Sequence, residues 1–333
     1  MHLPGDIRYV LRLIRWQNLL IVILTMVLMR YALVQTLAGG IYVMLDEGQG
    51  EAVRMTLRFP WYDFVILVFA TVCITAGGYV INDYFDIRTD LINRGEVIIG
   101  TRIPRRKAIL WHSILNIAGV TAGFYVSARA GYLWFGTIFL LISGLLYFYS
   151  ASYKRQFLVG NLLVAVLTAL VPVLAVLFEW TGLYRYYSVH AGNLPDLKFL
   201  FWWAGGFALF AFLTTFIREI IKDIEDFEGD AAYGRNTLPV VTGIPVSKFI
   251  SVSLIIATIV LLFLAWFLFI SDMITLIYLS AAIVLPLVAA VFRLLSGKNR
   301  KELHAASGLI KLVMLAGILY SLVVKIIIDC NLL

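Results

Sequence analysis

Apolar residues occur in long uninterrupted blocks along this chain, rather than in the short amphipathic repeats of a water-soluble protein. Seven windows contain no Asp, Glu, Lys or Arg, and each approaches the roughly 20 residues that a helix needs to cross the membrane hydrocarbon. Two further stretches contain Arg30, or Lys311 and Lys325, whose side chains can snorkel or face other helices. The pattern predicts nine spans, over residues 16–38, 62–82, 108–128, 131–150, 157–179, 199–219, 249–271, 273–293 and 305–328.

Basic residues between these blocks predict the orientation of the chain. If the N-terminus is cytoplasmic, nineteen of the 27 Lys and Arg residues fall in inside segments and five in outside segments. Positive charge collects on the cytoplasmic side of membrane proteins. We therefore expect an all-α integral membrane protein, a single bundle domain over residues 1–333 with a cytoplasmic N-terminus, in a bacterial or archaeal inner membrane.

Composition supports this class of protein. The 333 residues are 62% hydrophobic and 14% charged, whereas soluble domains are about 45–50% apolar and about 25% charged. This excludes a cytosolic enzyme, a disordered chain and a nucleic-acid-binding module. Two cysteines cannot form a disulfide framework, and four scattered histidines lack the spacing of zinc ligands.

Acidic residues are concentrated where the second and sixth spans end. Nine of the twenty Asp and Glu residues lie in two short windows, 83–90 and 219–230. Three aspartates of each window stand at i, i+3 and i+7, which places them on one face of a helix. These are Asp83, Asp86 and Asp90 in the first window, and Asp223, Asp226 and Asp230 in the second. Four spans separate the windows, so both aspartate-rich loops are expected on the cytoplasmic side.

Two converging acidic faces require cations between them. Like charges 4 Å apart repel by about 4 kcal/mol at an effective dielectric constant near 20. Mg²⁺ fits such a site, because it binds a few carboxylates and completes its shell with water and phosphate oxygens. Basic residues such as Arg88 and Lys222 alternate with the acids, which favours a diphosphate site. The alternative to a binding site is that these charges only form a solvated face at the membrane surface. Two clusters with the same spacing on the same side argue against it.

Both acidic windows carry motifs of a known family. Asn82-Asp83-x-x-Asp86-x-x-x-Asp90 resembles the first aspartate motif of the UbiA superfamily of intramembrane prenyltransferases. Asp223-x-Glu225-Asp226-x-x-Gly229-Asp230 resembles the second. The likeness extends to nine helices and to further residues along nearly the whole chain, namely Arg15-x-x-Asn18, Tyr149-Ser150, Tyr153-Lys154-Arg155, Gly234-x-Asn236-Thr237-Leu238-Pro239 and Gly243.

This resemblance implies a Mg²⁺-dependent enzyme that ionises a polyprenyl diphosphate and passes the prenyl group to a hydrophobic or lipid-phosphate acceptor within the membrane. By position, the six aspartates of the two motifs are the predicted metal ligands. The predicted catalytic residues are Asp86, Asp226, Lys154 and Tyr149. The predicted diphosphate-binding residues are Asn18, Asn82, Arg88 and Lys222. Nucleic acid is not an expected partner.

One segment departs from the family. A proline-rich stretch often follows the first motif, but residues 93–100 read Asn-Arg-Gly-Glu-Val-Ile-Ile-Gly. The second motif is most similar to the branch that makes digeranylgeranylglyceryl phosphate, so geranylgeranylglyceryl phosphate is the expected acceptor. An aromatic acceptor, as in quinone, haem or chlorophyll synthesis, is the first alternative. A cation transporter is the second, although transporters place ionisable groups near the midplane and here they lie at span ends.

Overall fold

The computed structural model describes residues 5–45, 52–94, 97–191, 195–297 and 299–330. Within these ranges, nine helices are long and apolar enough to cross a membrane, and every predicted span overlaps one of them. Their bounds are Trp16–Gly39, Trp61–Phe85, Arg105–Ala130, Leu133–Ala151, Val159–His190, Lys198–Glu225, Ile244–Ile270, Met273–Ser296 and Arg300–Asp329. The prediction of an all-α membrane fold with nine spans is confirmed.

The chain divides into two compact units, residues 1–24, 61–163 and 226–243 in the first and residues 25–60, 164–225 and 244–333 in the second. Helices α2 (Trp16–Leu28) and α8 (Val159–His190) belong partly to each. The other elements of the first unit are α1 (Gly5–Leu13), α4 (Trp61–Phe85), α5 (Ile87–Arg94), α6 (Arg105–Ala130), η2 (Leu133–Phe135), α7 (Gly136–Ala151), η3 (Tyr153–Arg155), α10 (Phe227–Ala232) and α11 (Leu238–Thr242). All of them are helical.

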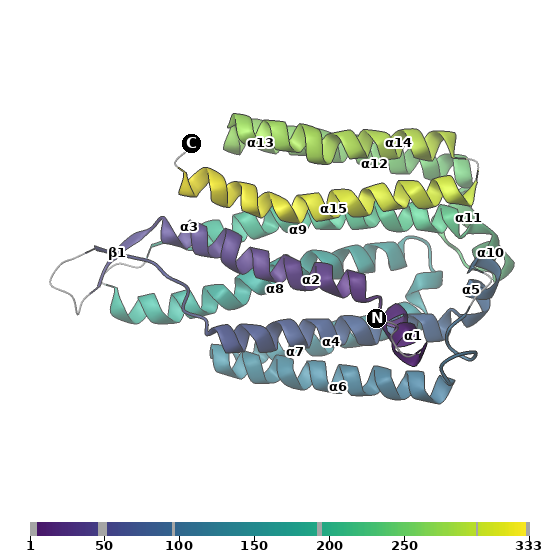
Figure 1. Ribbon diagram of the computed structural model, residues 1–333, viewed down its shortest axis with the longest axis horizontal. Helices are drawn as coiled ribbons and strands as arrows, with labels where there is room; N and C mark the ends of the chain where they lie inside the picture. Colours follow the sequence, from purple (N-terminus) through teal and green to yellow (C-terminus); the bar gives the residue numbers. More distant parts are fainter. Residues whose placement is uncertain (1–4, 46–51, 95–96, 192–194, 298, 331–333) are drawn as a thin grey trace. The chain divides into compact units, whose positions relative to one another are not determined.

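Helices α4, α6 and α7 lie side by side in the first unit (Figure 1). Small residues make the close approach possible: a Cβ atom on Gly119 would lie 2.6 Å from Ile74, and one on Gly123 would lie 2.4 Å from Phe139. Such contacts drive helix association in lipid, where hydrophobic burial gives no preference for a neighbouring helix. At one end of α4, the buried carboxylate of Asp63 accepts a hydrogen bond from Arg129 at 3.3 Å.

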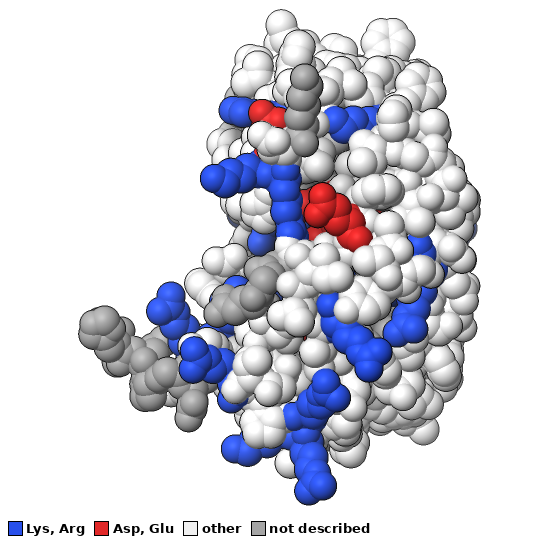
Figure 2. Space-filling view, turned by 90° about the vertical axis from the view of Figure 1, so that its right-hand side faces the viewer, with Lys and Arg blue, Asp and Glu red and all other residues white. Residues whose placement is uncertain are grey.

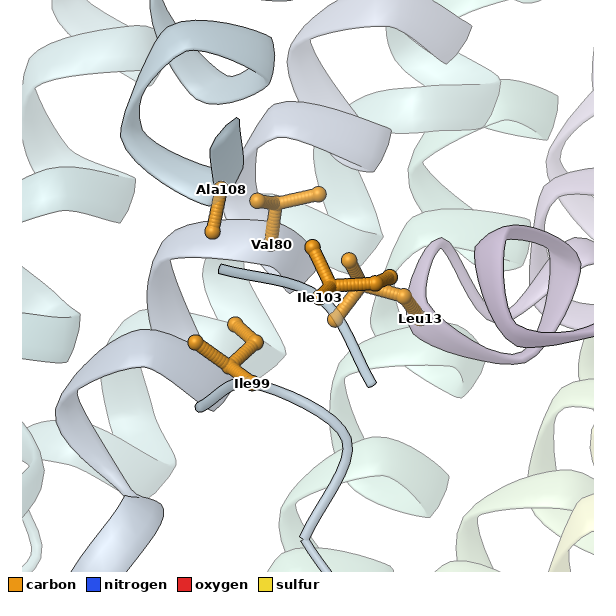
Figure 3. Packing of buried hydrophobic residues seen from close by; sticks show 5 residues of the cluster. All are labelled: Leu13, Val80, Ile99, Ile103 and Ala108. Atoms are coloured by element: carbon orange, nitrogen blue, oxygen red, sulfur yellow. The ribbon is translucent and has the colours of Figure 1, made fainter. Parts of the chain in front are cut away.

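At the other end of α4, a small apolar cluster fixes α1 and the segment that precedes α6. Leu13, Val80, Ile99, Ile103 and Ala108 are all buried and point toward one another (Figure 3). Leu13 is the last residue of α1, and α2 begins three residues later. Arg15, in the intervening turn, has a φ of 51°, a left-handed conformation that is uncommon for residues other than glycine. The cluster therefore holds this turn beside the acidic end of α4.

The second unit contains η1 (Met29–Val34), α3 (Gln35–Gly39), α9 (Lys198–Glu225), α12 (Ile244–Ala265), η4 (Trp266–Ile270), α13 (Met273–Tyr278), η5 (Leu279–Val284), α14 (Leu285–Ser296) and α15 (Arg300–Asp329). Helix α15 packs against α9 and α14. Strands β1 (Tyr42–Met44) and β2 (Ala52–Arg54) form a short antiparallel pair with Val43 opposite Val53. This pair lies between the first and second spans.

Two helices continue six or more residues past the C-terminal ends of their predicted spans, because hydropathy alone marks these ends too early. Helix α8 continues past residue 179 to His190, since Leu183 and Tyr187 are fully buried and keep an apolar face. Helix α9 continues past residue 219 to Glu225, where Ile220 and Ile221 are fully buried. Much of the second acidic window is therefore helical.

A buried ion pair lies inside the second unit. Arg30, in the π-helical η1, approaches Glu179 of α8 with 2.9 Å between Nη1 and Oε1, and its Nη2 donates to the carbonyl of Phe59 at 2.6 Å. Both charged side chains are almost completely buried. Burying an unpaired charge is costly, and here each side chain compensates the charge of the other.

Candidate diphosphate site

The first acidic segment is a helix with one interruption. Helix α4 ends at Phe85 and α5 begins at Ile87. Asp86 stands between them, yet its N–H donates to the carbonyl of Asn82 at 3.0 Å and its own carbonyl accepts from Asp90 N–H at 2.8 Å. Helical hydrogen bonding thus continues through the interruption. Asp86 is 3% exposed, so its carboxylate depends on protein partners.

The second acidic segment turns sharply after its last aspartate. Asp230, also 3% exposed, lies on α10, and Gly234 follows in the left-handed region with a φ of 64°. Glycine suits this conformation because it has no Cβ. The turn places Arg235 next to α10, where its N–H donates to the carbonyl of Asp230 at 3.0 Å.

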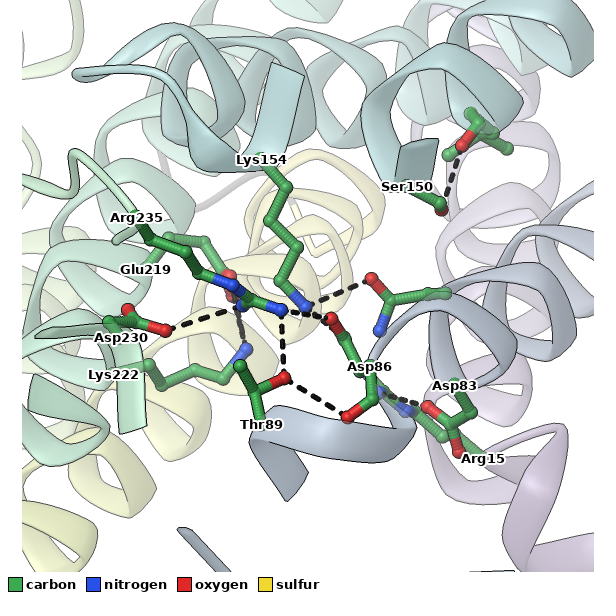
Figure 4. A network of polar contacts seen from close by, with 12 residues as sticks. Arg15, Asp83, Asp86, Thr89, Ser150, Lys154, Glu219, Lys222, Asp230 and Arg235 are labelled. Atoms are coloured by element: carbon green, nitrogen blue, oxygen red, sulfur yellow. Dashed lines mark hydrogen bonds and ion pairs between the residues drawn. The ribbon is translucent and has the colours of Figure 1, made fainter. Parts of the chain in front are cut away.

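Arg235 joins the two acidic segments. Its Nη2 lies 2.7 Å from Oδ1 of Asp86, and its Nη1 lies 3.3 Å from Oδ1 of Asp230. The same Nη2 donates to Thr89 Oγ1 at 2.8 Å. Figure 4 shows the guanidinium lying between the two carboxylates. The structure thus brings Asp86 and Asp230 together around one buried cation.

Lys154 is a second cation on Asp86. It extends from η3, pairs with the Asp86 carboxylate and donates to Asn82 Oδ1 at 3.1 Å (Figure 4). The short turn that carries Lys154 is fixed by Asn236, whose N–H donates to the carbonyl of Arg155 at 3.0 Å. Two carboxylates and two cations therefore balance their charges in a buried site.

The two aspartates have opposite electrostatic environments. Burial raises the pKa of Asp86, but Lys154 and Arg235 outweigh it and bring this pKa down to about 2. Burial raises the pKa of Asp230 to about 6, because the lowering effect of Arg235 is smaller and the neighbouring Asp226 adds to the rise. The ionised form of Asp86 is therefore favoured more strongly than that of Asp230.

Other predicted residues lie near this cluster in the first unit. Asp83 pairs with Arg15 at 2.9 Å, and Asn18 donates to Tyr79 Oη at 3.3 Å. Arg88 is exposed on α5. The remaining residues of this unit are half-buried and lie on α5, on α7 and at the residue before α10, namely Asp90, Tyr149 and Asp226. Their predicted roles stay predictions.

The remaining two predicted site residues lie in the second unit. Asp223 and Lys222 lie near the end of α9, where Lys222 Nζ pairs with Glu219 at 3.0 Å. Residues 95 and 96 of the divergent segment lie outside the described ranges. Across those ranges, no group of three or more His, Cys, Asp or Glu side chains is arranged to hold a metal ion.

Sequence reasoning missed the residue that joins the segments. Arg235 stands five positions after Asp230, outside both acidic windows. Thr89 was also missed, although it stands at i+3 from Asp86. That polar position shares a helical face with Asp86, which is the signal that could have identified it.

Comparisons with known proteins identify the family of this chain. A family model described as the UbiA prenyltransferase family matches residues 50–315. The chain belongs to the UbiA prenyltransferase family. It is therefore a membrane-embedded prenyltransferase, and the resemblance inferred from the aspartate motifs is confirmed.

Among its relatives are archaeal proteins named digeranylgeranylglyceryl phosphate synthase. The one from Thermococcus kodakarensis is 32% identical over 274 residues, which covers 80% of this chain and 88% of the relative. The one from Methanobrevibacter smithii is 33% identical over 252 residues, which covers 75% of this chain and 83% of the relative.

Solved structures share the fold. A UbiA homologue from Aeropyrum pernix K1 has a TM-score of 0.63 at 13% identity and covers 91% of this chain and 98% of its own. A UbiA homologue from Archaeoglobus fulgidus bound to DMAPP and Mg²⁺ has a TM-score of 0.51 at 16% identity, with 95% and 99% coverage. At this identity, the likeness establishes the fold alone.

Proposed function

We propose that this enzyme transfers a geranylgeranyl group from its diphosphate to the hydroxyl of geranylgeranylglyceryl phosphate, with Mg²⁺ as cofactor. The observation that carries the proposal is the pairing of Asp86 and Asp230 around Arg235 in one buried cluster. Support for the acceptor comes from the names of the relatives. Support for the donor and metal comes from the Archaeoglobus homologue bound to DMAPP and Mg²⁺.

The donor set suits Mg²⁺. Asn82, Asp86 and Asp230 offer only carboxylate and amide oxygens, which this hard ion prefers, and Mg²⁺ in phosphate sites needs one or two carboxylates because the substrate supplies the rest. We assign Asp83, Asp90, Asp223 and Asp226 to the same role from the motifs. When bound, the metal would neutralise the charge that develops on the leaving diphosphate.

Lys154 and Arg235 act on the diphosphate itself. Arginine and lysine form strong charge-assisted hydrogen bonds with phosphate oxygens, and both cations lie at the cluster before substrate arrives. The allylic C–O bond breaks and its electron pair remains on the diphosphate. The acceptor hydroxyl oxygen then forms the new C–O bond and releases its proton. Asn18, Arg88, Lys222 and Tyr149 are assigned to diphosphate contacts or cation stabilisation.

We place this site on the cytoplasmic side of a bacterial or archaeal membrane. The first unit exposes many cations near the acidic segments, among them Arg88, Arg102 and Arg105. Figure 2 shows basic side chains spread over the side of the molecule on which α5 and α10 lie. Cytoplasmic segments carry the excess of Lys and Arg, which supports this orientation.

A product assay tests the function. Purified protein receives geranylgeranyl diphosphate and Mg²⁺ with geranylgeranylglyceryl phosphate, with 4-hydroxybenzoate or with no acceptor, and products are identified by mass spectrometry. We expect digeranylgeranylglyceryl phosphate together with released diphosphate, and loss of both on chelation of Mg²⁺. Product from the aromatic acceptor alone would favour the quinone-type alternative. Cation flux in proteoliposomes without diphosphate release would favour a transporter.

Gly160 offers a test of the Lys154 turn. A Cβ at this position would lie 2.9 Å from Lys154 Cα and 3.2 Å from the Tyr153 carbonyl. Gly160→Ala is therefore expected to displace Lys154 and to lower kcat/KM for the diphosphate donor roughly tenfold, since small misplacements are costly at reacting centres. Steady-state kinetics would measure the change. Gly144→Ala on α7 is the matched control, because its Cβ meets nothing within 4 Å, and equal losses in both variants would contradict the assignment.

A further inference from the structure

Helix α5 faces the second acidic segment through polar side chains that are not acidic. Thr89 and Asn93 are both buried and stand four residues apart, so they share one face of the helix. Thr89 accepts a hydrogen bond from Arg235 at 2.8 Å, and Asn93 Oδ1 accepts one from Gly229 N–H at 3.0 Å. Helix α5 thus contacts the α10 region at two points one turn apart.

The Asn93 contact satisfies a group that α10 leaves without a helical partner. Gly229 lies in the first turn of α10, where backbone N–H groups have no acceptor within the helix. A side chain at the N-cap often accepts from this position, but the side chain at the Asp226 N-cap makes no capping hydrogen bond. Asn93 supplies the acceptor from another helix. A buried N–H without an acceptor would lose its hydration with no hydrogen bond in return.

The fit between the two residues is close. A Cβ built on Gly229 would lie 2.3 Å from Asn93 Oδ1 and 2.6 Å from both its Cγ and its Nδ2. These three atoms are the nearest neighbours of that position. A side chain at residue 229 would therefore push α5 and α10 apart. The lack of a side chain at Gly229 thus leaves the space that the Asn93 amide fills.

We propose that Asn93 is a positioning residue for the diphosphate site, acting through Gly229. By fixing α5 to α10 it sets the distance between Asp86 of the first motif and Asp230 of the second, which lie in the same unit. This inference rests on the proposed function, because the distance matters only where both motifs bind one metal–diphosphate headgroup.

A binding experiment separates this role from a purely structural one. Wild type, Asn93→Ala, Gly229→Ala and the double variant are purified as full chains. Their melting temperatures are followed as inorganic pyrophosphate is added at fixed Mg²⁺. We expect each single variant to raise the pyrophosphate concentration for half-maximal stabilisation about tenfold, as residues that support metal ligands typically do. The double variant is expected to match Asn93→Ala alone, because the atoms that obstruct a new Cβ belong to Asn93.

Asn116→Ala is the matched control. Asn116 on α6 accepts a hydrogen bond from Ser143 on α7 at 2.6 Å and belongs to helix packing. Its loss is expected to lower the melting temperature without moving the pyrophosphate midpoint. If Asn93→Ala has the same pyrophosphate midpoint as wild type, this inference is wrong and the proposed function stands. If Asn93→Ala does not fold, the same result in Gly229→Ala leads to the same conclusion. A wild type that neither responds to pyrophosphate nor transfers prenyl groups would overturn the proposed function, and this inference with it.

Discussion

Replacing Asp86 by alanine is expected to lower the rate of prenyl transfer by about 1000-fold, while the protein remains folded. Asp86 is the carboxylate that both cations of the site contact, and its loss removes an anion from the metal-binding set. The fold is expected to survive, because both cations retain other partners. Lys154 still donates a hydrogen bond to Asn82, and Arg235 still contacts Asp230 and Thr89. Released diphosphate and prenylated product, measured on protein that elutes as a single species, give the result.

Asp63→Ala provides the comparison for this experiment. Asp63 is a buried aspartate at the opposite end of α4, roughly 35 Å from Asp86 at 1.5 Å per residue. Its pairing with Arg129 is structural, so the variant is expected to lose stability and keep its turnover. Asp226→Ala is expected to behave like Asp86→Ala. Near-normal turnover in either of these two variants would contradict the site.

Replacing Arg235 by alanine is expected to damage both stability and activity. Removing one partner from a buried ion pair costs about 3–5 kcal/mol, because a buried charge is left uncompensated. Here two carboxylates, Asp86 and Asp230, would lose their shared cation. Activity is expected to fall about 10–100-fold, as when a residue that orients metal ligands is removed. Thermal unfolding and steady-state kinetics would measure the two effects.

A second substitution distinguishes these two effects. Asp230→Asn in the Arg235→Ala background removes the less stably charged of the two carboxylates, since burial holds the pKa of Asp230 near 6. The double variant is expected to regain melting temperature but not turnover. Arg105 is exposed at the start of α6, so Arg105→Ala should change neither the melting temperature nor the turnover. Recovery of activity along with stability would show that neither Arg235 nor the Asp230 carboxylate is needed for turnover.

The spans could be predicted from sequence because the membrane imposes one simple rule: a helix must remain apolar over its whole crossing. The rule failed at Glu179 and Glu219, where charge ended the hydropathy window but not the helix. Both helices continue because residues such as Leu183 and Ile220 pack against neighbours. Hydropathy measures the cost of lipid exposure and carries no information on such packing.

The aspartates, Asn82 and Lys154 of the candidate site could be predicted from the motifs, but the pairing among its residues could not. Helical spacing placed Asp83 and Asp86 on one face, yet Asp83 pairs with Arg15 while Asp86 pairs with Lys154 and Arg235. Those cations come from elements distant in sequence, and their choice of partner depends on how the elements pack. The same holds for Asn93, whose contact with Gly229 spans the two motifs and leaves no local pattern.

The pairing of Arg30 with Glu179 also bears on biogenesis. Arg30 belongs to the first span and Glu179 to the fifth, about 150 residues later. At roughly 5–20 residues per second, a ribosome needs on the order of 10–30 s between the two. Throughout that interval the newly made first helix carries a positive charge whose counter-ion has not been synthesised. A defect at Glu179 would therefore arise during insertion and assembly, before any substrate is met.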